Sequence, residues 1–254
     1  MDLPRTPSFR LDGRRALITG AGRGIGLAAA SALADQGAHV TLVARSADEI
    51  EAAAAAIRAK GGQAAALALD VLDLAATEAA ISAAEPFDIL VNNAGTNRPK
   101  PFTDVTVDDF DAVMGLNVRA AFFLAQHVAK RLLAAKRPGS IINVSSQMGH
   151  VGAPNRTIYC ASKWAIEGLT KAMAVELAPQ GIRVNTLCPT FIRTPLGEQT
   201  LAIPERKAWI LSKIKLGRVG EIADVMGPIV FLASEASAMV TGTSLLVDGG
   251  WTAD

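Results

Sequence analysis

The sequence predicts an α/β fold: a single doubly wound parallel sheet of about seven strands, with helices on both faces. Two observations predict this fold. Short aliphatic runs of 4 to 7 residues alternate with longer helical patterns along the whole chain. The runs are apolar on both sides, as strands are when helices cover both faces of a parallel sheet. Because no linker, low-complexity tract or internal repeat marks a boundary, we expect one domain over residues 1–254.

The predicted strands, in chain order, are Ala16–Thr19, His39–Val43, Ala64–Leu69, Ile89–Asn92, Ser140–Val144, Ile182–Leu187 and Ser244–Val247. The predicted helices between them are Ile25–Gln36, Ala47–Lys60, Leu74–Ala83, Val107–Lys136, Tyr159–Ala178 and Glu221–Leu232. Gly37 and Gly61 follow the first two helices as C-terminal stops. Thr106 is a predicted N-cap, and the acidic Asp108 and Asp109 follow it in the first turn. The alternation of strands and helices implies right-handed crossovers and therefore a parallel sheet.

One segment departs from this alternation. Residues 195–216 are polar, contain Pro204, and fall between a strand and the next helix. Insertions at that edge of such a sheet commonly form a mobile lid over a ligand, and we expect a substrate lid here. A surface helix without a role is the alternative.

Composition excludes several classes of partner. Half of the residues are hydrophobic but only 5% are aromatic, which suits close packing of helices on a sheet. The 25 basic and 24 acidic residues are spread along the chain, so neither a nucleic-acid partner nor a membrane-surface helix is expected. No uncharged apolar stretch reaches the ~18 residues that suggest a membrane span. The start of the chain lacks the apolar run of a signal peptide, so we expect a cytoplasmic location.

The cysteine and histidine content argues against a metal site. Cys160 and Cys188 show no C-x-x-C spacing, and only three histidines are available. We therefore predict no metal and two free core thiols, although a disulfide is formally possible.

A glycine-rich turn follows the first predicted strand. The G-x-G-x-x-G pattern does not fit in either register, but G-x-x-x-G-x-G fits through Gly20, Gly24 and Gly26. Such a turn brings the backbone close to a pyrophosphate and directs the free N–H groups of a helix N-terminus at it. Three glycines can also form a simple turn. Their position between a strand and an Ala-rich helix favours dinucleotide binding.

The end of the second predicted strand indicates which nicotinamide is preferred. An NAD-selective site has an Asp or Glu there to bind the ribose hydroxyls, but this chain has Ala44, and no carboxylate follows until Asp48. Arg45 comes next, and Arg23 lies in the glycine-rich turn. Because guanidinium groups bind phosphate bidentately, NADP is favoured over NAD. The alternative is that Arg45 is a solvated residue and that selectivity is weak.

Tyr159 and Lys163 are the strongest chemical signal. Their i, i+4 spacing places them on one face of a predicted helix. A free tyrosine has a pKa near ~10, and a neighbouring ammonium favours the phenolate, so we expect Lys163 to lower that pKa into the range of acid–base catalysis. A hydroxyl at the end of the preceding strand, from Ser145 or Ser146, can bind the substrate oxygen beside the phenol.

Together these motifs resemble the short-chain dehydrogenase/reductase family over essentially the full length, and in particular its gluconate 5-dehydrogenase-like and 3-oxoacyl-ACP reductase-like members. The matching residues are the glycine-rich turn with Thr19, the run Asn92-Asn93-Ala94-Gly95, Asn117, Ser146, Tyr159, Lys163 and the stretch Cys188-Pro189-Thr190. Ser146 lies 13 residues before Tyr159, which is the family spacing and favours it over Ser145. Thr190 departs from the glycine that is usual after the proline. The resemblance implies a Rossmann-like sheet.

The resemblance also implies the roles of the residues. Tyr159 exchanges a proton with the substrate oxygen, Ser146 polarises that oxygen, Lys163 lowers the tyrosine pKa and holds the nicotinamide ribose, and Asn117 supports a proton-carrying water chain. The run Asn93-Ala94-Gly95 shapes the cofactor floor or stabilises the strand end. The expected cofactor contacts are Gly20, Arg23, Gly24, Ile25, Gly26, Arg45, Asp70, Val71, Asn93, Ala94, Gly95, Tyr159, Lys163, Pro189, Ile192 and Thr194.

The substrate is expected to be a small hydroxylated or carbonyl compound, of sugar-acid or polyol type. The polar and basic residues near the catalytic groups or in the lid that we expect to contact it are Asn97, Arg98, Gln147, His150, Arg156, Arg193 and Trp209. His150 is interpreted as a pocket wall, because Tyr159 already serves as the acid–base group. The runs Ser145-Ser146-Gln147-Met148 and Met226-Gly227-Pro228 resemble the sugar-acid branch of the family.

Three alternative functions differ from this reading. A 3-oxoacyl thioester reductase would use the same chemistry. An epimerase or dehydratase of the family usually adds a C-terminal substrate domain, and this chain ends soon after Val247. A nucleotide-binding sensor would tolerate losses among the four catalytic residues, and all four are present.

The long predicted helices carry apolar faces beyond what one sheet face needs, and the resemblance implies that they pair in a homotetramer.

Overall fold

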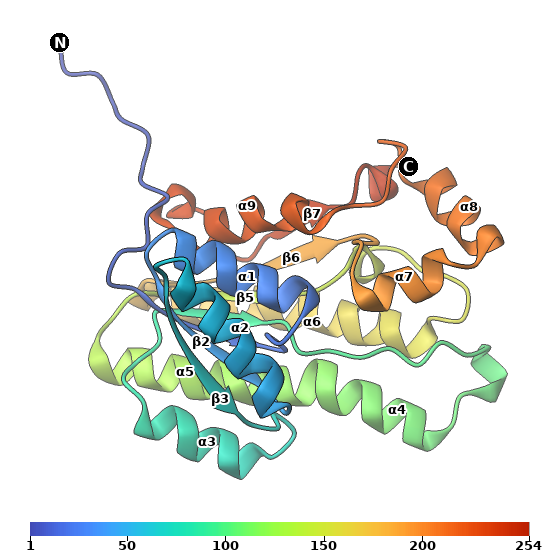
Figure 1. Cartoon of the computed structure of the whole chain (residues 1–254), viewed down its shortest axis with the longest axis horizontal. Helices are drawn as coiled ribbons and strands as arrows, with labels where there is room; N and C mark the ends of the chain where they lie inside the picture. Colours follow the sequence, from blue (N-terminus) through green and yellow to red (C-terminus); the bar gives the residue numbers. More distant parts are fainter. Residues whose placement is uncertain (254) are drawn as a thin grey trace.

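The computed structural model describes residues 1–253, without the side chains of Pro195, Leu196 and Gln199. Over these residues, seven parallel strands form one sheet in the order β3-β2-β1-β4-β5-β6-β7 (Figure 1). The strands are β1 (Arg15–Thr19), β2 (His39–Ala44), β3 (Gln63–Ala68), β4 (Ile89–Asn92), β5 (Gly139–Val144), β6 (Ile182–Pro189) and β7 (Ser244–Val247). The predicted fold class is confirmed.

Helices cover both faces of the sheet (Figure 1). One face carries α1 (Gly24–Asp35), α2 (Ala47–Ala59) and α9 (Ile222–Ala233), and the other carries α3 (Leu74–Ala83), α4 (Val107–Met114), α5 (Ala121–Ala135) and α6 (Thr157–Leu177). The helix ends that were predicted from glycine and N-cap residues are confirmed. Gly37 and Gly61 adopt positive φ after α1 and α2, and Thr106 and Asp109 form a reciprocal capping box at the start of α4.

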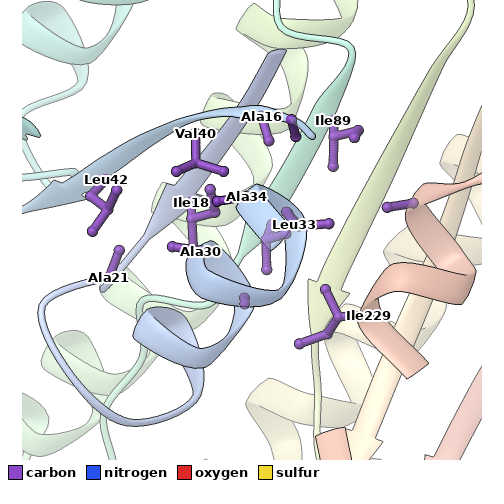
Figure 2. Packing of buried hydrophobic residues seen from close by; sticks show 14 of the residues in the cluster. Ala16, Ile18, Ala21, Ala30, Leu33, Ala34, Val40, Leu42, Ile89 and Ile229 are labelled. Carbon is purple, nitrogen blue, oxygen red and sulfur yellow. The ribbon is translucent and has the colours of Figure 1, made fainter. Parts of the chain in front are cut away.

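The strands contribute to two separate cores, because their side chains alternate between faces. In β1, Ala16 and Ile18 belong to the cluster under α1 and α9, whereas Leu17 belongs to the cluster under α3 and α5. Figure 2 shows Leu33 of α1 among the residues of the first cluster, close to Ile18. Leu33 is completely buried. Small residues along the rest of α1 let the helix lie close to the sheet, so its N-terminus is held firmly above the end of β1.

The sheet order changes direction between β1 and β4. The chain runs outward from β1 through β2 to β3, and then returns to place β4 on the opposite side of β1. In such sheets, the loops at the carboxyl ends of the two strands diverge and leave a crevice where ligands bind. The loops that follow β1 and β4 are the glycine-rich turn and the run that begins at Asn93. The fold therefore places the predicted cofactor motifs at this crevice.

The predicted helix Val107–Lys136 needs a correction. A π-helical turn, Gly115–Ala120, separates α4 from α5. A π turn holds one more residue per hydrogen-bonded ring than an α turn, so it alters the direction of the side chains within it, and such turns frequently occur at functional sites. Asn117 lies in this turn.

The segment Val107–Ala135 is apolar and long enough to cross a membrane by length and composition. In this fold it covers one face of the sheet, where Leu124 and Val128 are buried in the core.

Residues 195–216 form α7 (Pro195–Leu201) and α8 (Pro204–Lys213), which lie beside the C-terminal end of the chain (Figure 1). Their inner side chains join a third apolar core, which we name the Trp251 cluster. Its buried members are Met148, Leu201, Ile210, Ile214, Val219 and Trp251, and the partly buried Tyr159, Cys160 and Phe191 pack against it. The predicted lid is thus attached directly to the start of α6, where Tyr159 lies.

Candidate active site

The four predicted catalytic residues converge from three elements. Ser146 follows β5, Tyr159 and Lys163 lie on α6, and Asn117 lies in the π turn. A hydrogen bond joins the Tyr159 and Ser146 side chains, and the Lys163 Nζ lies 5.5 Å from the centre of the Tyr159 ring. The structure therefore brings the predicted acid–base pair and its serine together.

Ser146 is held in place by its own neighbours in the chain. Its hydroxyl donates to the Gln147 Oε1 at 2.7 Å and accepts from the Met148 backbone N–H at 3.1 Å. Both residues are buried, so the serine rotamer is constrained on the side away from solvent. A hydroxyl oriented in this way beside a phenol can hold a substrate oxygen between them.

Lys163 is buried and donates a hydrogen bond to the Val144 carbonyl at 2.9 Å. Burial lowers its pKa to about 8, and the neighbouring Cys188 and Glu167 act in the opposite direction. Because burial raises the pKa of the Cys188 thiol to about 12, that thiol is neutral at pH 7. Glu167 is therefore the anion that helps to keep Lys163 protonated at neutral pH.

The expected lowering of the Tyr159 pKa is not found. Burial raises the pKa of Tyr159, and the hydrogen bond to Ser146 and the positive charge of Arg156 only partly oppose this. Lys163 lies over the ring, where it contacts the π face rather than the oxygen. The sequence showed that Lys163 is near the tyrosine, but it could not show how strongly the phenol is desolvated.

Asn117 joins two segments of the site. Its side-chain amide accepts from the Thr96 N–H at 2.8 Å and donates to the Thr96 carbonyl at 2.9 Å. The same amide donates to the Ser162 Oγ at 3.0 Å, and this hydroxyl donates to the Tyr159 carbonyl. Ser162 was not predicted. Its only sequence signal is its position between Tyr159 and Lys163 on α6.

Glu167 is a second residue that sequence reasoning missed. It lies one helical turn after Lys163 and is buried. Its carboxylate accepts hydrogen bonds from Thr186 of β6 at 2.9 Å and from Ser244 of β7 at 2.5 Å. The His150 Nε2 lies 3.8 Å away. The i+4 spacing from Lys163 was the available signal, but burial of this carboxylate depends on β6 and β7.

The glycine-rich turn has the geometry of a phosphate-binding loop. Gly20 and Gly24 adopt φ of +63° and +58°, which other residues rarely adopt. A Cβ at Gly26 would collide with the Gly20 carbonyl and lie 2.5 Å from the Asn93 Nδ2. The N-terminus of α1 has no side-chain cap and no acidic residue in its first turn. Its free N–H groups, Ile25 among the first, therefore suit an anionic ligand, so the residues fit a dinucleotide pyrophosphate.

The two arginines of the predicted 2′-phosphate site, Arg23 and Arg45, have different surroundings. Arg45 is exposed at the end of β2, whereas Arg23 forms an exposed ion pair with Glu49 at 3.8 Å. Glu49, which sequence reasoning did not consider, also packs against Gly22. The ion pair is exposed and weak, so it leaves Arg23 available for a phosphate.

The other predicted cofactor residues surround the same crevice or stabilise it. The Asn93 amide donates to the carbonyls of Thr19 and Gly20, and the Ala94 N–H donates to the Thr19 hydroxyl, so this run fastens β4 to β1. A Cβ on Gly95 would lie 3.2 Å from the Asn117 Oδ1. The Asp70 carboxylate accepts from the Leu72 N–H, which is a loop-capping role.

The remaining four positions are Val71, which follows β3, and three residues on or just after β6. Val71 is buried after β3, Pro189 ends β6, and Ile192 is buried and bridges to Gly220. Thr194 caps α7, and its methyl group would be 3.5 Å from a Cβ on Gly24. Thr194 and the glycine-rich turn therefore approach each other across the crevice. The Thr190 hydroxyl is buried without a partner among the described residues.

Residues 20–252 match the family model described as Enoyl-(Acyl carrier protein) reductase. This match covers most of the chain and agrees with the geometry above. The chain belongs to the short-chain dehydrogenase/reductase family. It is therefore an oxidoreductase, as the sequence predicted, and its sheet is the sheet of that family.

Individual relatives in this family cover almost the whole chain. The D-erythrulose reductase of Gallus gallus is 43% identical over 96% of this chain and 98% of its own length. The gluconate 5-dehydrogenase of Gluconobacter oxydans is 39% identical over 96% of both chains. The crystal structure of a gluconate 5-dehydrogenase from Burkholderia cenocepacia, in complex with NADP and tartrate, superimposes with a TM-score of 0.93 at 38% identity and covers 97% of this chain and 98% of its own.

The predicted substrate residues of this short-chain dehydrogenase/reductase are not equally available. Arg98 is engaged by Asp108 at 2.5 Å and by Asp109, so it holds the loop after β4 to the start of α4. Arg193 pairs with Glu198 and Glu221, and it holds α7 to the start of α9.

Other predicted substrate residues lie closer to the predicted catalytic side chains. Gln147 is buried against Ser146. Trp209 of α8 is 38% exposed and packs edge-on against Trp251 at 5.3 Å. Arg156 is half-buried immediately before α6, and Asn97 is half-buried in the loop after β4. His150 makes no hydrogen bond through its buried Nε2 among the described residues, and it faces Glu167.

Proposed function

We propose that this chain is an NADP-dependent dehydrogenase/reductase that interconverts a hydroxyl and a carbonyl group on a small sugar-derived substrate: a polyol, a ketose or a sugar acid. The observation that carries this proposal is the grouping of Tyr159, Ser146 and Lys163 at the same edge of the parallel sheet as the glycine-rich turn. Relatives over 96% of this chain are named as reductases or dehydrogenases of such compounds. A relative at 38% identity was crystallised with NADP.

In the reducing direction, Tyr159 donates its phenolic proton to the carbonyl oxygen of the substrate, and Ser146 holds that oxygen by a hydrogen bond. A nicotinamide held in the crevice would supply the hydride for the carbonyl carbon. Lys163 stabilises the phenolate that remains and would hold the nicotinamide ribose. Asn117 supports the return of a proton from solvent. In the oxidising direction the same residues act in reverse.

The thioester-reductase alternative has less support, because the relatives described above are named for sugar-derived alcohols and ketones. The sensor alternative is opposed by the grouping of all four catalytic side chains.

Three further features belong to this proposal. The segment 195–216 acts as a lid, supported by its packing on the Trp251 cluster beside Tyr159. The enzyme is cytoplasmic. It assembles as a homotetramer through α4 and α6, supported by large apolar side chains exposed there, such as Trp164 at 55% and Val175 at 78%.

The Tyr159→Phe variant tests the chemistry. The structure predicts at least a hundredfold loss of kcat, in the range of about 10²–10⁴ that general acid–base catalysis supplies, because the ring keeps its packing but loses the transferable proton. The affinity for NADPH, measured by fluorescence titration, should stay within about threefold. Turnover is measured by NADPH oxidation with D-erythrulose, L-xylulose and 5-keto-D-gluconate. Turnover above one tenth of wild type would remove Tyr159 from the proposed role.

A further inference from the structure

Two arginines from different segments of the chain lie near each other beside the Trp251 cluster, and one of them acts on Tyr159. Arg156 immediately precedes α6, and its carbonyl accepts a hydrogen bond from the Cys160 N–H at 2.7 Å. Arg206 lies in the first turns of α8, four residues before Ile210. Cys160 and Ile210 both belong to the Trp251 cluster. Arg156 is half-buried and Arg206 is exposed, and the charge of Arg206 acts on Arg156, so the two side chains lie near each other at the edge of this cluster.

Neither arginine has an acidic partner within the part of the chain that the structure describes. Among residues 1–253, Arg156 and Arg206 form no side-chain hydrogen bond or ion pair. The other arginines around the lid are paired: Arg193 with Glu198 and Glu221, and Arg218 with Asp224. The two free guanidinium groups are therefore an exception within this region.

Electrostatics make the pair unfavourable without a ligand. Burial lowers the pKa of Arg156, and the charge of Arg206 lowers it further, whereas the Tyr159 side chain acts in the opposite direction. Two like charges at the edge of an apolar cluster repel each other, and burial increases the cost for Arg156. The N-terminus of α6, a helix of 21 residues, adds positive potential at the same place and has no side-chain cap. A bound anion would relieve all three unfavourable features.

We infer that Arg156 and Arg206 form the subsite for an anionic end group of the substrate, and that this group is the carboxylate of a sugar acid. The inference rests on the proposed oxidoreductase function. Guanidinium forks bind carboxylates bidentately, which would orient the substrate as well as hold it. Arg156 is the N-cap residue of α6, three residues before Tyr159, and its charge acts on the phenol, so the anionic group would lie a short carbon chain away from the oxygen that Tyr159 protonates. Arg206 belongs to the lid, so an anionic substrate would also favour its closed position.

This subsite distinguishes between the substrate types of the relatives. D-erythrulose is a neutral sugar, whereas gluconate carries a carboxylate. The enzyme should therefore prefer keto acids to neutral ketoses. A phosphate ester presents similar anionic oxygens, so the experiment includes one.

The test compares kcat/KM of the full-length enzyme with NADPH for 5-keto-D-gluconate, L-xylulose and D-xylulose 5-phosphate. For wild type, we expect a value for the keto acid at least tenfold above that for the neutral ketose. In Arg206→Gln, the ratio between the keto acid and the neutral ketose should fall by about tenfold or more, as expected for loss of a charge-assisted hydrogen bond. Arg156→Gln should lower the same ratio.

Lys207→Gln is the matched control, because it removes the same charge from the adjacent, exposed position of α8. It should keep the wild-type ratio. Arg206→Lys, which retains the charge, should recover part of the preference.

The outcomes separate the two proposals. Tyr159-dependent turnover with equal or better use of the neutral ketose would overturn the anion subsite and leave the oxidoreductase function intact. The same would follow if Arg206→Gln and Lys207→Gln changed the ratio equally. A larger dependence on these arginines for the phosphate ester than for the keto acid would reject the carboxylate and assign a sugar phosphate. No Tyr159-dependent turnover of any of the three compounds would count against the proposed function itself.

Discussion

Tyr159 shows how the surroundings of a single residue determine its chemistry. A free tyrosine has a pKa near ~10, and burial raises the pKa of Tyr159 in the ligand-free protein. The phenol therefore keeps its proton at neutral pH, which is the form that carbonyl reduction requires. Oxidation of an alcohol requires the deprotonated form, so it should be favoured at higher pH. The pH dependence of the rate in each direction is thus coupled to the desolvation of this one hydroxyl.

At the same scale, we propose that Arg45 determines the preference for NADP over NAD. Arg45→Ala should weaken NADPH binding by about tenfold or more, because a charge-assisted hydrogen bond to the 2′-phosphate contributes about 1.5–3 kcal/mol. NADH has no phosphate there and should lose less than about threefold. Dissociation constants from fluorescence titration at constant salt measure both effects.

Lys60→Ala provides the control for Arg45, because Lys60 is an exposed cation at the other end of α2. It should leave the ratio of NADPH to NADH affinity unchanged. Equal losses of NADPH and NADH affinity in Arg45→Ala would contradict the selectivity assigned to this residue.

At the scale of an element, α6 acts as the frame of the active site. Lys163 fastens it to β5 through the Val144 carbonyl, and Glu167 fastens it to β6 and β7 through Thr186 and Ser244. Both charged groups are buried on one face of the helix. A helix held by two buried polar contacts one turn apart has little freedom to rotate, so the position of Tyr159 on it is fixed.

The Glu167→Gln variant tests the electrostatic part of this arrangement. Burial already lowers the Lys163 pKa to about 8, and Glu167 opposes this, so removing its charge should lower the pKa further. The ammonium is present below that pKa and is lost as the pH rises through it. The decline of kcat/KM for carbonyl reduction at alkaline pH should therefore begin at a lower pH than in wild type. A pH–rate profile from pH 6 to pH 10 measures this shift.

Glu176→Gln is the matched control, because Glu176 lies on the same helix and is exposed. Its profile should coincide with that of wild type. A thermal unfolding curve shows whether Glu167→Gln remains folded. A folded variant with an unshifted profile would show that Glu167 only holds the helix in place.

At the scale of the whole molecule, the exposed apolar surface indicates assembly. Trp164 and Val175 project from α6, and Val107 and Phe110 project from α4. These two helices contact each other on one face of the sheet, so the side chains contribute to one side of the molecule. Isolated exposed apolar residues are ordinary, but several large ones on neighbouring helices indicate an interface.

We therefore expect sedimentation equilibrium to give four times the chain mass of 26.4 kDa. The double variant Trp164→Glu and Val175→Glu should dissociate into smaller species, because each change places an unpaired charge in the interface. Leu72→Glu, at an exposed position after β3, should not dissociate the assembly. A wild-type chain that sediments as a monomer would exclude the tetramer.

Most of the fold could be predicted from the sequence, because strand and helix patterns depend on short-range periodicity. The bounds of β4, β7 and α3 agree with the predicted ones, and the other strand ends differ by one or two residues. The π turn at Asn117 could not be predicted, because an α and a π turn have the same apolar pattern. In the structure, the Asn117 side chain forms hydrogen bonds with Thr96 and Ser162, which are distant from it in the sequence.

By itself, the sequence determined the order of the elements, the glycine-rich turn and the predicted catalytic residues that the structure brings together. These features depend on local hydrogen bonding, on glycine conformations and on spacing along one helix. Only the tertiary structure decided the desolvation of Tyr159, the burial of Glu167 between α6 and two strands, and the approach of Arg206 to Arg156. The reason is that pKa values and charge pairing depend on distance and solvent exposure, and packing between segments far apart in the chain sets both.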